Sequence, residues 1–124
     1  MPKLILIVDD DMNFVTTIAR RLKAVGYEIL AAFDAISAVR QAQEKRPDLI
    51  ILDLKLPAGG GYKTYQHLKT SINTALIPIL FVTGFSKDEF PEMTKIEDFE
   101  KYLLTKPFTA EDLLVKLKSI LEGL

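Results

Sequence analysis

Polar side chains that could carry out chemistry follow the apolar runs of this 124-residue sequence. Asp9 and Asp10 come directly after the run LILIV, and Asp53 ends the run LIILD. Thr83 ends the run IPILFVT, and Lys106 lies two residues after the run YLL. Three carboxylates, one hydroxyl and one ammonium therefore occupy similar positions at the ends of different apolar runs.

This set of side chains suits a magnesium ion and a phosphoryl group. Clustered carboxylates without cysteine or histidine form a hard oxygen site, which prefers Mg²⁺ to zinc. Mg²⁺ is usually held by one or two carboxylates together with phosphate oxygens, so phosphate is the natural second ligand. A hydroxyl and an ammonium can bind other phosphoryl oxygens, and a carboxylate can itself accept phosphate as an aspartyl phosphate. Asp53 is the candidate acceptor.

The glycines at 59–61 suggest a different phosphate site, a nucleotide-binding loop, but their spacing argues against it. The P-loop pattern ends in Gly-Lys-Ser/Thr, whereas Tyr62 precedes Lys63 and Thr64. The dinucleotide pattern needs a third glycine where Thr64 stands. We therefore interpret the three glycines as a turn that needs a permissive backbone before a helix.

Composition limits the class of protein. An apolar content of 48% is enough for one domain with a real core. Sixteen basic and seventeen acidic residues nearly cancel, so no global field attracts nucleic acid or anionic membranes. The absence of cysteine excludes disulfides and thiolate metal sites, and no apolar run approaches the roughly 20 residues of a membrane span. We expect a cytoplasmic protein with one domain over residues 1–124, without direct nucleic-acid binding and without a membrane partner.

Five apolar runs that read as strands alternate with helical patterns. The runs lie at residues 4–8, 27–33, 49–53, 77–83 and 102–104. Four of them lack period-two alternation, as expected of parallel strands buried on both faces. Helical stripes follow four runs, at Phe14, Ile18, Leu22 and Val25, at Ala35, Val39 and Ala42, at Tyr65, Leu68 and Ile72, and at Leu113, Leu114, Leu117, Ile120 and Leu121. The pattern predicts a (βα)₅ chain and a doubly wound five-stranded parallel sheet with helices on both faces.

The predicted sheet should bring the polar strand-end residues together. Parallel strands share one carboxyl edge, and ligands of such sheets bind outside that edge. Asp9, Asp53, Thr83 and Lys106 are therefore expected to converge. Asp11 has a simpler interpretation, since one acid before an amphipathic helix usually caps its N-terminus.

Four motifs resemble the receiver domain of two-component response regulators, the family of the bacterial chemotaxis regulator. They are, in chain order, ILIVDDD, PDLIILDLKLP, ILFVTG and LLTKPFT, and the resemblance covers essentially all 124 residues. It implies a flavodoxin-like fold with strand order 2-1-3-4-5. It also implies a signalling phosphoacceptor that catalyses its own phosphorylation and slow dephosphorylation, and not a conventional enzyme.

The resemblance implies a metal and phosphate site. Asp53 would be the phosphoacceptor, and Asp9 and Asp10 the acidic pair that binds Mg²⁺ with it. The backbone carbonyl of Lys55 would be a further metal ligand. The donor would be a sensor histidine kinase or a histidine phosphotransfer protein carrying phosphohistidine.

The residues that would respond to phosphate only partly follow the family. Thr83 resembles the switch hydroxyl and Lys106 the phosphate-binding lysine, whose bond to Pro107 is expected to be cis. The family usually has Tyr or Phe three residues before this lysine, where this sequence has Leu103, with Tyr102 one residue earlier. Because a one-residue step in a strand reverses the face of the side chain, either Tyr102 is not the switch ring or the local register is altered.

The segment 86–101, SKDEFPEMTKIEDFEK, also departs from the family. Ser86 and Glu89 could form a capping box, yet Pro91 would then lie inside the helix at a cost of about 3 kcal/mol. We expect a turn, a break near Phe90 and Pro91, and a short or irregular helix. Receivers commonly dock partners on the face formed by this segment, the last strand and the last helix, so we expect an unusual output partner there.

Two alternatives remain beside the phosphorylation switch. One is a pseudo-receiver that docks partners without being phosphorylated. The other is a phosphohydrolase of the haloacid dehalogenase type, which needs a second carboxylate where this sequence has Lys55. In receivers, residues at the positions of Lys55 and Phe85 line the path of the attacking water, so these two large side chains predict slow loss of phosphate.

Overall fold

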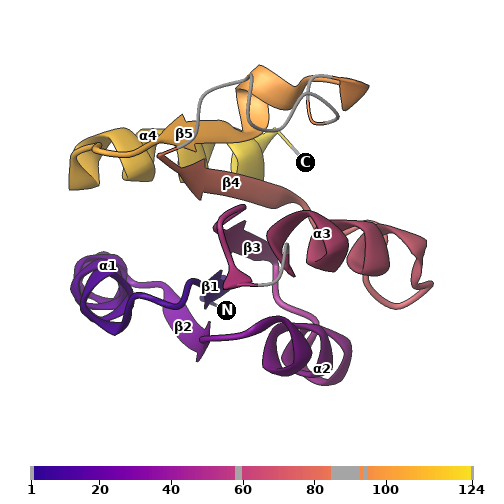
Figure 1. Ribbon diagram of the computed structural model, residues 1–124. Helices are drawn as coiled ribbons and strands as arrows, with labels where there is room; N and C mark the ends of the chain where they lie inside the picture. The colour runs from indigo at the N-terminus through magenta and orange to yellow at the C-terminus, as the bar shows by residue number, and fades with distance from the viewer. Residues whose placement is uncertain (1, 58–59, 85–92, 94, 124) are drawn as a thin grey trace.

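The computed structural model describes residues 2–57, 60–84, 93 and 95–123. A single five-stranded parallel sheet forms its centre, in the order β2-β1-β3-β4-β5 (Figure 1). The strands are β1 (Leu4–Val8), β2 (Glu28–Ala32), β3 (Leu49–Leu52), β4 (Ile79–Thr83) and β5 (Leu103–Thr105). The predicted parallel sheet and its strand order are confirmed.

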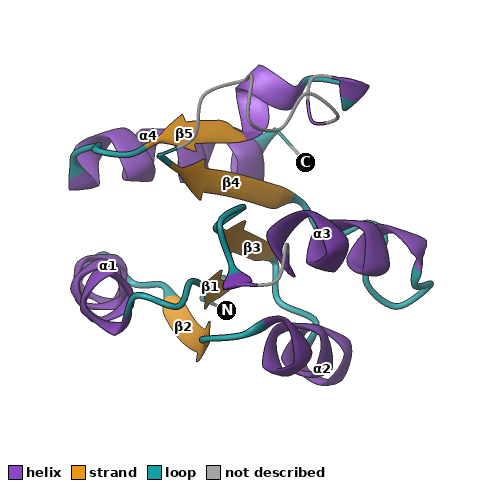
Figure 2. Cartoon of the chain, in the orientation of Figure 1, coloured by secondary structure: helices purple, strands orange, loops and turns teal. Residues whose placement is uncertain are grey.

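Helices cover both faces of the sheet, as predicted for a doubly wound fold (Figure 2). They are α1 (Met12–Ala24), α2 (Ala35–Lys45), α3 (Gly60–Thr70) and α4 (Ala110–Glu122), with a short 3₁₀ helix, η3 (Phe99–Tyr102). Helix α4 corresponds to the last helix predicted from the sequence. Because the segment 86–101 is described only at residue 93 and from residue 95 onward, the capping box at Ser86 and the break near Pro91 lie outside the described residues.

Two hydrophobic clusters lie on opposite faces of the sheet, since neighbouring residues of a strand point to opposite faces. Helices α1 and α4 cover the first, the α1/α4 cluster, which contains Ile5, Ile7, Val15, Ile18, Leu22, Leu49, Ile51, Leu80, Val82, Leu113, Leu117 and Ile120. Helices α2 and α3 cover the second, the α2/α3 cluster, which contains Leu6, Val8, Ala32, Ala38, Ala42, Ile50, Leu52, Leu54, Leu56, Leu68, Ile79, Phe81, Met93 and Phe99. Burial of strands on both faces explains their continuous apolar runs.

Polar side chains cap the N-termini of three helices at the carboxyl edge of the sheet. Asp11 caps α1 and accepts a hydrogen bond from the Phe14 amide at 3.1 Å, which confirms its predicted structural role. Asp34 caps α2, and Thr109 forms a capping box with Asp112 at the start of α4. These caps place the first turns of the helices beside the strand ends, where the candidate site lies.

Two details of the predicted helices were wrong. Ile72 was assigned to the third helical stripe, but α3 ends at Thr70 and the Ile72 side chain is 95% exposed. Val25 was assigned to the first stripe, but it is the C-cap of α1 and is exposed, next to Gly26 at φ 102°. Periodicity continues past a helix end whenever an apolar residue falls at the next spacing, so it cannot locate the end alone.

Gly60 and Gly61 lie inside the first turn of α3, whereas the sequence suggested a turn before the helix. A Cβ atom on Gly61 would lie 2.6 Å from the Asp53 carbonyl oxygen and would also meet the Leu54 backbone. Gly61 is therefore required because the helix approaches the backbone that follows β3. Gly59 lies outside the described residues.

Within the part of the chain that the structure describes, no helix has the length and hydropathy needed to cross a membrane.

Candidate functional site

Backbone hydrogen bonds extend the sheet beyond the strand ends and place the polar residues there. The Asp53 amide donates to the last carbonyl of β1 at 3.0 Å, and the Asp9 amide donates to the last carbonyl of β2 at 3.2 Å. The Lys106 amide donates to the Thr83 carbonyl at 3.0 Å. The residues predicted at the strand ends thus lie along one edge, as the parallel sheet requires.

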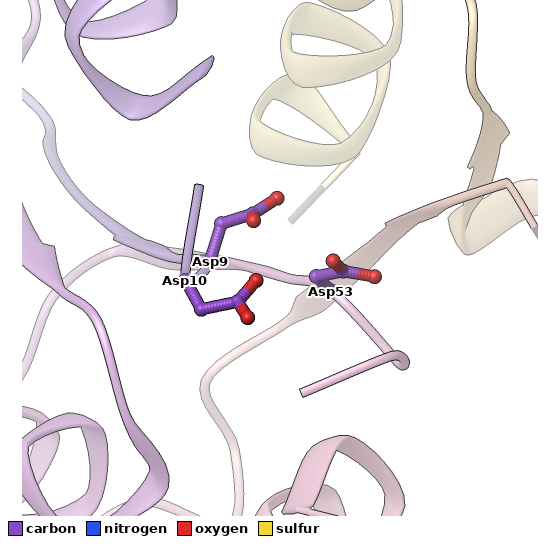
Figure 3. A group of neighbouring side chains, drawn as sticks. All are labelled: Asp9, Asp10 and Asp53. Atoms are coloured by element: carbon purple, nitrogen blue, oxygen red, sulfur yellow. The ribbon is translucent and has the colours of Figure 1, made fainter. Parts of the chain in front are cut away.

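The carboxylates of Asp9, Asp10 and Asp53 form one group. One oxygen atom from each carboxylate lies within 4.8 Å of the others, and Figure 3 shows Asp9 and Asp10 leaving the same loop beside Asp53. Asp9 and Asp53 are buried, with 1% and 6% exposure, while Asp10 is exposed. The group is therefore anchored in the protein and open to solvent on the side of Asp10. Oxygen donors without nitrogen or sulfur, accessible from water, fit Mg²⁺.

Lys106 brings a positive charge to the site. Its Nζ lies 2.8 Å from Asp9 Oδ2 and 3.7 Å from Asp53 Oδ2, and its side chain is 26% exposed. The Lys106–Pro107 peptide bond is cis, as expected. The ammonium thus lies between the two buried carboxylates and pairs more closely with Asp9.

The Asp53 carboxyl is held in an environment that disfavours its charge. Burial raises its pKa above the ordinary value. The Lys55 amide, which donates to Asp53 Oδ1 at 3.0 Å, acts in the opposite direction. The negative charge of Asp9 raises the pKa further, and the positive charge of Lys106 lowers it. The net effect is a raised pKa, so an added cation would relieve an unfavourable charge at this site.

Thr83 lies buried beside Asp53 at the end of β4. Its side chain is fully buried, and its hydroxyl makes no hydrogen bond of ordinary length and angle among the described residues. It is nevertheless close enough to lower the pKa of Asp53. A buried hydroxyl without a partner is uncommon, because desolvation of a hydroxyl without a compensating hydrogen bond is unfavourable. This hydroxyl is available to an additional acceptor at the site.

Lys55 follows the acceptor position on the loop after β3. Lys55 is exposed, and its backbone amide donates a hydrogen bond to Asp53 Oδ1. The backbone of Lys55 therefore lies beside the carboxylate group, while its carbonyl as a metal ligand stays a prediction. Phe85, which the sequence placed near the same path of water, lies outside the described residues.

Leu103 and Tyr102 pack against different hydrophobic clusters, although only Leu103 lies in β5. Leu103 pairs in register with Phe81 and packs against the α2/α3 cluster. Tyr102 ends η3 and packs against the α1/α4 cluster. An aromatic ring is therefore absent from the position three residues before Lys106, and the ring that the sequence has nearby packs against a different cluster.

Sequence reasoning missed one contact of the site. Phe14 was assigned to the first helical stripe, and it does pack against the α1/α4 cluster, but its ring centre also lies 4.0 Å from the Lys106 Nζ. A signal was present, because Phe14 falls in the first turn of the helix that follows Asp9 and so must lie near the carboxyl edge of the sheet.

The sequence profile of the response regulator receiver domain family matches residues 5–118. The chain belongs to this family. The receiver domain is 36% identical over 124 residues to RpaA of Synechocystis, a DNA-binding dual master transcriptional regulator, an alignment that covers 98% of this chain and 49% of RpaA. It is therefore a signalling domain of the two-component response regulators.

Solved structures of receiver domains resemble this one closely. The chemotaxis response regulator CheY4 of Vibrio cholerae has a TM-score of 0.85 and 28% identity, with 97% of this chain and 99% of CheY4 covered. The receiver domain of the sensor histidine kinase PA1611 of Pseudomonas aeruginosa has a TM-score of 0.82 and 27% identity, with 98% and 99% covered. That structure contains a magnesium ion coordinated in its active-site cleft.

The expectation of no nucleic-acid partner was wrong for this group of proteins. RpaA is DNA-binding, and other relatives are transcriptional regulatory proteins. The chain spans about half the length of these curated relatives. The expectation rested on the nearly balanced charge of the 124 residues, and that balance describes only this receiver domain.

Proposed function

We propose that this receiver domain accepts a phosphoryl group on Asp53 from a phosphohistidine donor, with Mg²⁺, and thereby changes its binding to partners. The observation that carries the proposal is the position of Asp53, a 6% exposed carboxylate whose oxygens lie within reach of Asp9 and Asp10 and 3.7 Å from the Lys106 ammonium. In this proposal, residues 1–124 act as one receiver domain.

The transfer uses Asp53 as the nucleophile. A carboxylate oxygen of Asp53 forms a bond to phosphorus while the bond from phosphorus to the histidine nitrogen of the donor breaks, and the imidazole leaves. Asp53 Oδ1 already accepts the Lys55 amide, which leaves Oδ2, on the side of Lys106, for the attack. The hydrogen bond to Oδ1 fixes the carboxylate before the donor arrives.

Three side chains and one carbonyl would hold the metal. Asp9, Asp10 and Asp53 supply the carboxylates, and Lys55 the carbonyl predicted from the family resemblance. Bound Mg²⁺ would offset the negative charge that accumulates when a phosphoryl group meets these carboxylates. Lys106 adds a positive charge 3.7 Å from Asp53 Oδ2.

The response would begin at Thr83 and Lys106. The Thr83 hydroxyl makes no hydrogen bond of ordinary length and angle among the described residues and can donate to a phosphoryl oxygen. Lys106 can pair with a phosphoryl oxygen in place of Asp9. Both residues border β5, so a shift at either one biases the face formed by η3, β5 and α4, which we assign to the output partner. Leu103 in place of an aromatic ring requires a different packing change from the one usual in the family.

The test is the intact mass after incubation with Mg²⁺ and acetyl phosphate. Wild-type protein should gain one phosphoryl group, and the gain should be absent with EDTA and in the Asp53→Asn variant. A folded wild-type protein that gains no mass from acetyl phosphate or from a phosphohistidine donor would refute the proposal and support a docking module that works without phosphorylation. A gain that persists in Asp53→Asn would refute the assignment of the acceptor.

A further inference from the structure

The loop between β1 and α1 contains Asp9, Asp10 and Asp11 and is called the acidic loop below. A closed series of contacts joins this loop, the first turn of α1 and Lys106. Asp9 Oδ1 accepts from the Asp11 amide at 3.0 Å, and Asp11 Oδ1 accepts from the Phe14 amide at 3.1 Å. The Phe14 ring centre lies 4.0 Å from the Lys106 Nζ, which in turn lies 2.8 Å from Asp9 Oδ2. The same aspartate therefore fixes the lysine directly and also helps to place the ring beside it.

The Phe14 ring is held from a second direction. It packs against Phe108 with a centroid distance of 6.0 Å and an interplanar angle of 88°. Phe108 lies two residues after Lys106, in the loop between β5 and α4. Edge-to-face packing is a favoured arrangement of two rings, so the orientation of Phe14 is set by the helix on one side and by the lysine's own loop on the other.

An aromatic ring acts on an ammonium differently from an aliphatic side chain. The negative face of the ring attracts a cation within about 6 Å of its centre. It offers no lone pair that would compete with the carboxylates for the N–H groups of lysine. Since the Lys106 side chain is 26% exposed, a ring on one side can restrict the ammonium to the space between the ring, Asp9 and Asp53 without removing its charge.

We propose that Phe14 is a positioning residue of the phosphoryl-transfer site, which holds the Lys106 ammonium beside Asp9 and Asp53 through a cation–π contact. This inference rests on the proposed function for its kinetic consequence, but not for the contact itself. While Lys106 exchanges Asp9 for a phosphoryl oxygen, the ring keeps the ammonium within reach of both.

The kinetic test compares the rates of phosphorylation by acetyl phosphate at a Mg²⁺ concentration that saturates each variant. Phe14→Leu should react about two- to fivefold more slowly, the change that a partly exposed cation–π contact supports. Phe14→Tyr, which keeps the ring, should react within about twofold of wild type. Tyr27→Leu is the matched control, because Tyr27 also packs against the α1/α4 cluster but precedes β2 at the opposite edge of the sheet.

The contact has a test that needs no phosphate. Protons above an aromatic face are shifted upfield in NMR spectra, so the ε-methylene protons of Lys106 should be shifted upfield in wild type and in Phe14→Tyr. The upfield shift should vanish in Phe14→Leu. The Lys106 resonance is identified as the one that disappears in Lys106→Arg.

The outcomes separate this inference from the proposed function. If wild type gains no phosphoryl group, the proposed function fails, and the NMR shift alone decides whether Phe14 holds Lys106. If wild type is phosphorylated, equal rates for wild type and Phe14→Leu overturn the inference. An equal slowing in Tyr27→Leu, or a failure of Phe14→Tyr to restore the rate, also overturns it, because the loss would then reflect packing in general.

Discussion

The Lys106 ammonium pairs with Asp9 at 2.8 Å, across 97 positions of the chain. Asp9 follows β1, an interior strand between β2 and β3, whereas Lys106 follows β5 at the edge of the sheet. Asp9 is buried, and the Lys106 ammonium forms an ion pair with its carboxylate. The pair therefore links the edge strand to the acidic loop.

Lys106→Met should lower the free energy of unfolding in EDTA by about 1–3 kcal/mol, since it leaves a buried carboxylate without its partner. The loss stays at this level because the Lys106 side chain is partly exposed and solvent screens the pair. Urea denaturation measures the change. Lys118→Met, at an exposed position on α4, is the control and should differ little from wild type. Equal stability of both variants would show that the ion pair does not stabilise the fold.

Asp53→Asn should stabilise the protein in EDTA, and the gain should grow as the pH rises. Burial, followed by the charge of Asp9, raises the pKa of Asp53 above its ordinary value of 3.8. The folded state therefore keeps this proton to higher pH than the unfolded chain does. The resulting stability is complete below pH 3.8 and is lost as the pH rises through the folded pKa.

The measurement for Asp53→Asn is urea unfolding of variant and wild type in EDTA from about pH 4 to about pH 7. The difference between the two proteins should be smallest at the acidic end. A constant difference over this range would show that packing, and not the charge of Asp53, sets the effect.

Mg²⁺ should raise the free energy of unfolding of wild type, because it binds the folded carboxylate group and not the unfolded chain. At about 100 times its dissociation constant the gain is about 2.7 kcal/mol. Asp10→Asn should remove most of the gain. Asp11→Asn is a matched control one residue away, since asparagine also caps a helix well and Asp11 is not in the carboxylate group. Thermal unfolding with and without Mg²⁺ compares them, and an equal loss in both variants would contradict the assigned ligands.

Gly61→Ala should destabilise the protein by about 1–3 kcal/mol or more, the range for overpacking. Its Cβ would meet the backbone of Leu54 and the Asp53 carbonyl oxygen at 2.6 Å. Gly60→Ala is the neighbouring control, because there the added Cβ would lie 3.4 Å from the Leu56 Cβ and the helix would gain propensity. Denaturation curves should therefore separate these two variants. Equal effects would mean that the loop after β3 moves freely away from α3.

Lys55→Ala should accelerate the loss of phosphate from Asp53. Lys55 is exposed, and its amide binds the Asp53 carboxylate, so its side chain starts beside the phosphorylated group. A shorter side chain opens a path for water. The half-life of the phosphorylated protein by intact mass measures the effect, with the exposed Lys45 changed to alanine as control. An unchanged half-life in Lys55→Ala would remove the shielding role.

Much of the site could be predicted because parallel strands share a carboxyl edge. Each apolar run ended in or near a polar residue, and the sheet then brought Asp9, Asp53, Thr83 and Lys106 to one place. The caps at Asp11 and Asp34 were also predictable, since a cap depends on residues three positions apart. Helix ends were harder to predict. Periodicity assigned Ile72 to the third helix, but that helix ends at Thr70.

By itself, the sequence determined the order of the elements, the parallel sheet and which residues meet at its edge, because these follow from local patterns and from the rules of strand crossover. Only the tertiary structure decided that Lys106 lies closer to Asp9 than to Asp53, that Phe14 lies beside Lys106, and that Gly61 must lack a side chain. Those relationships are distances between segments remote in the chain, and packing of whole helices against the sheet sets them.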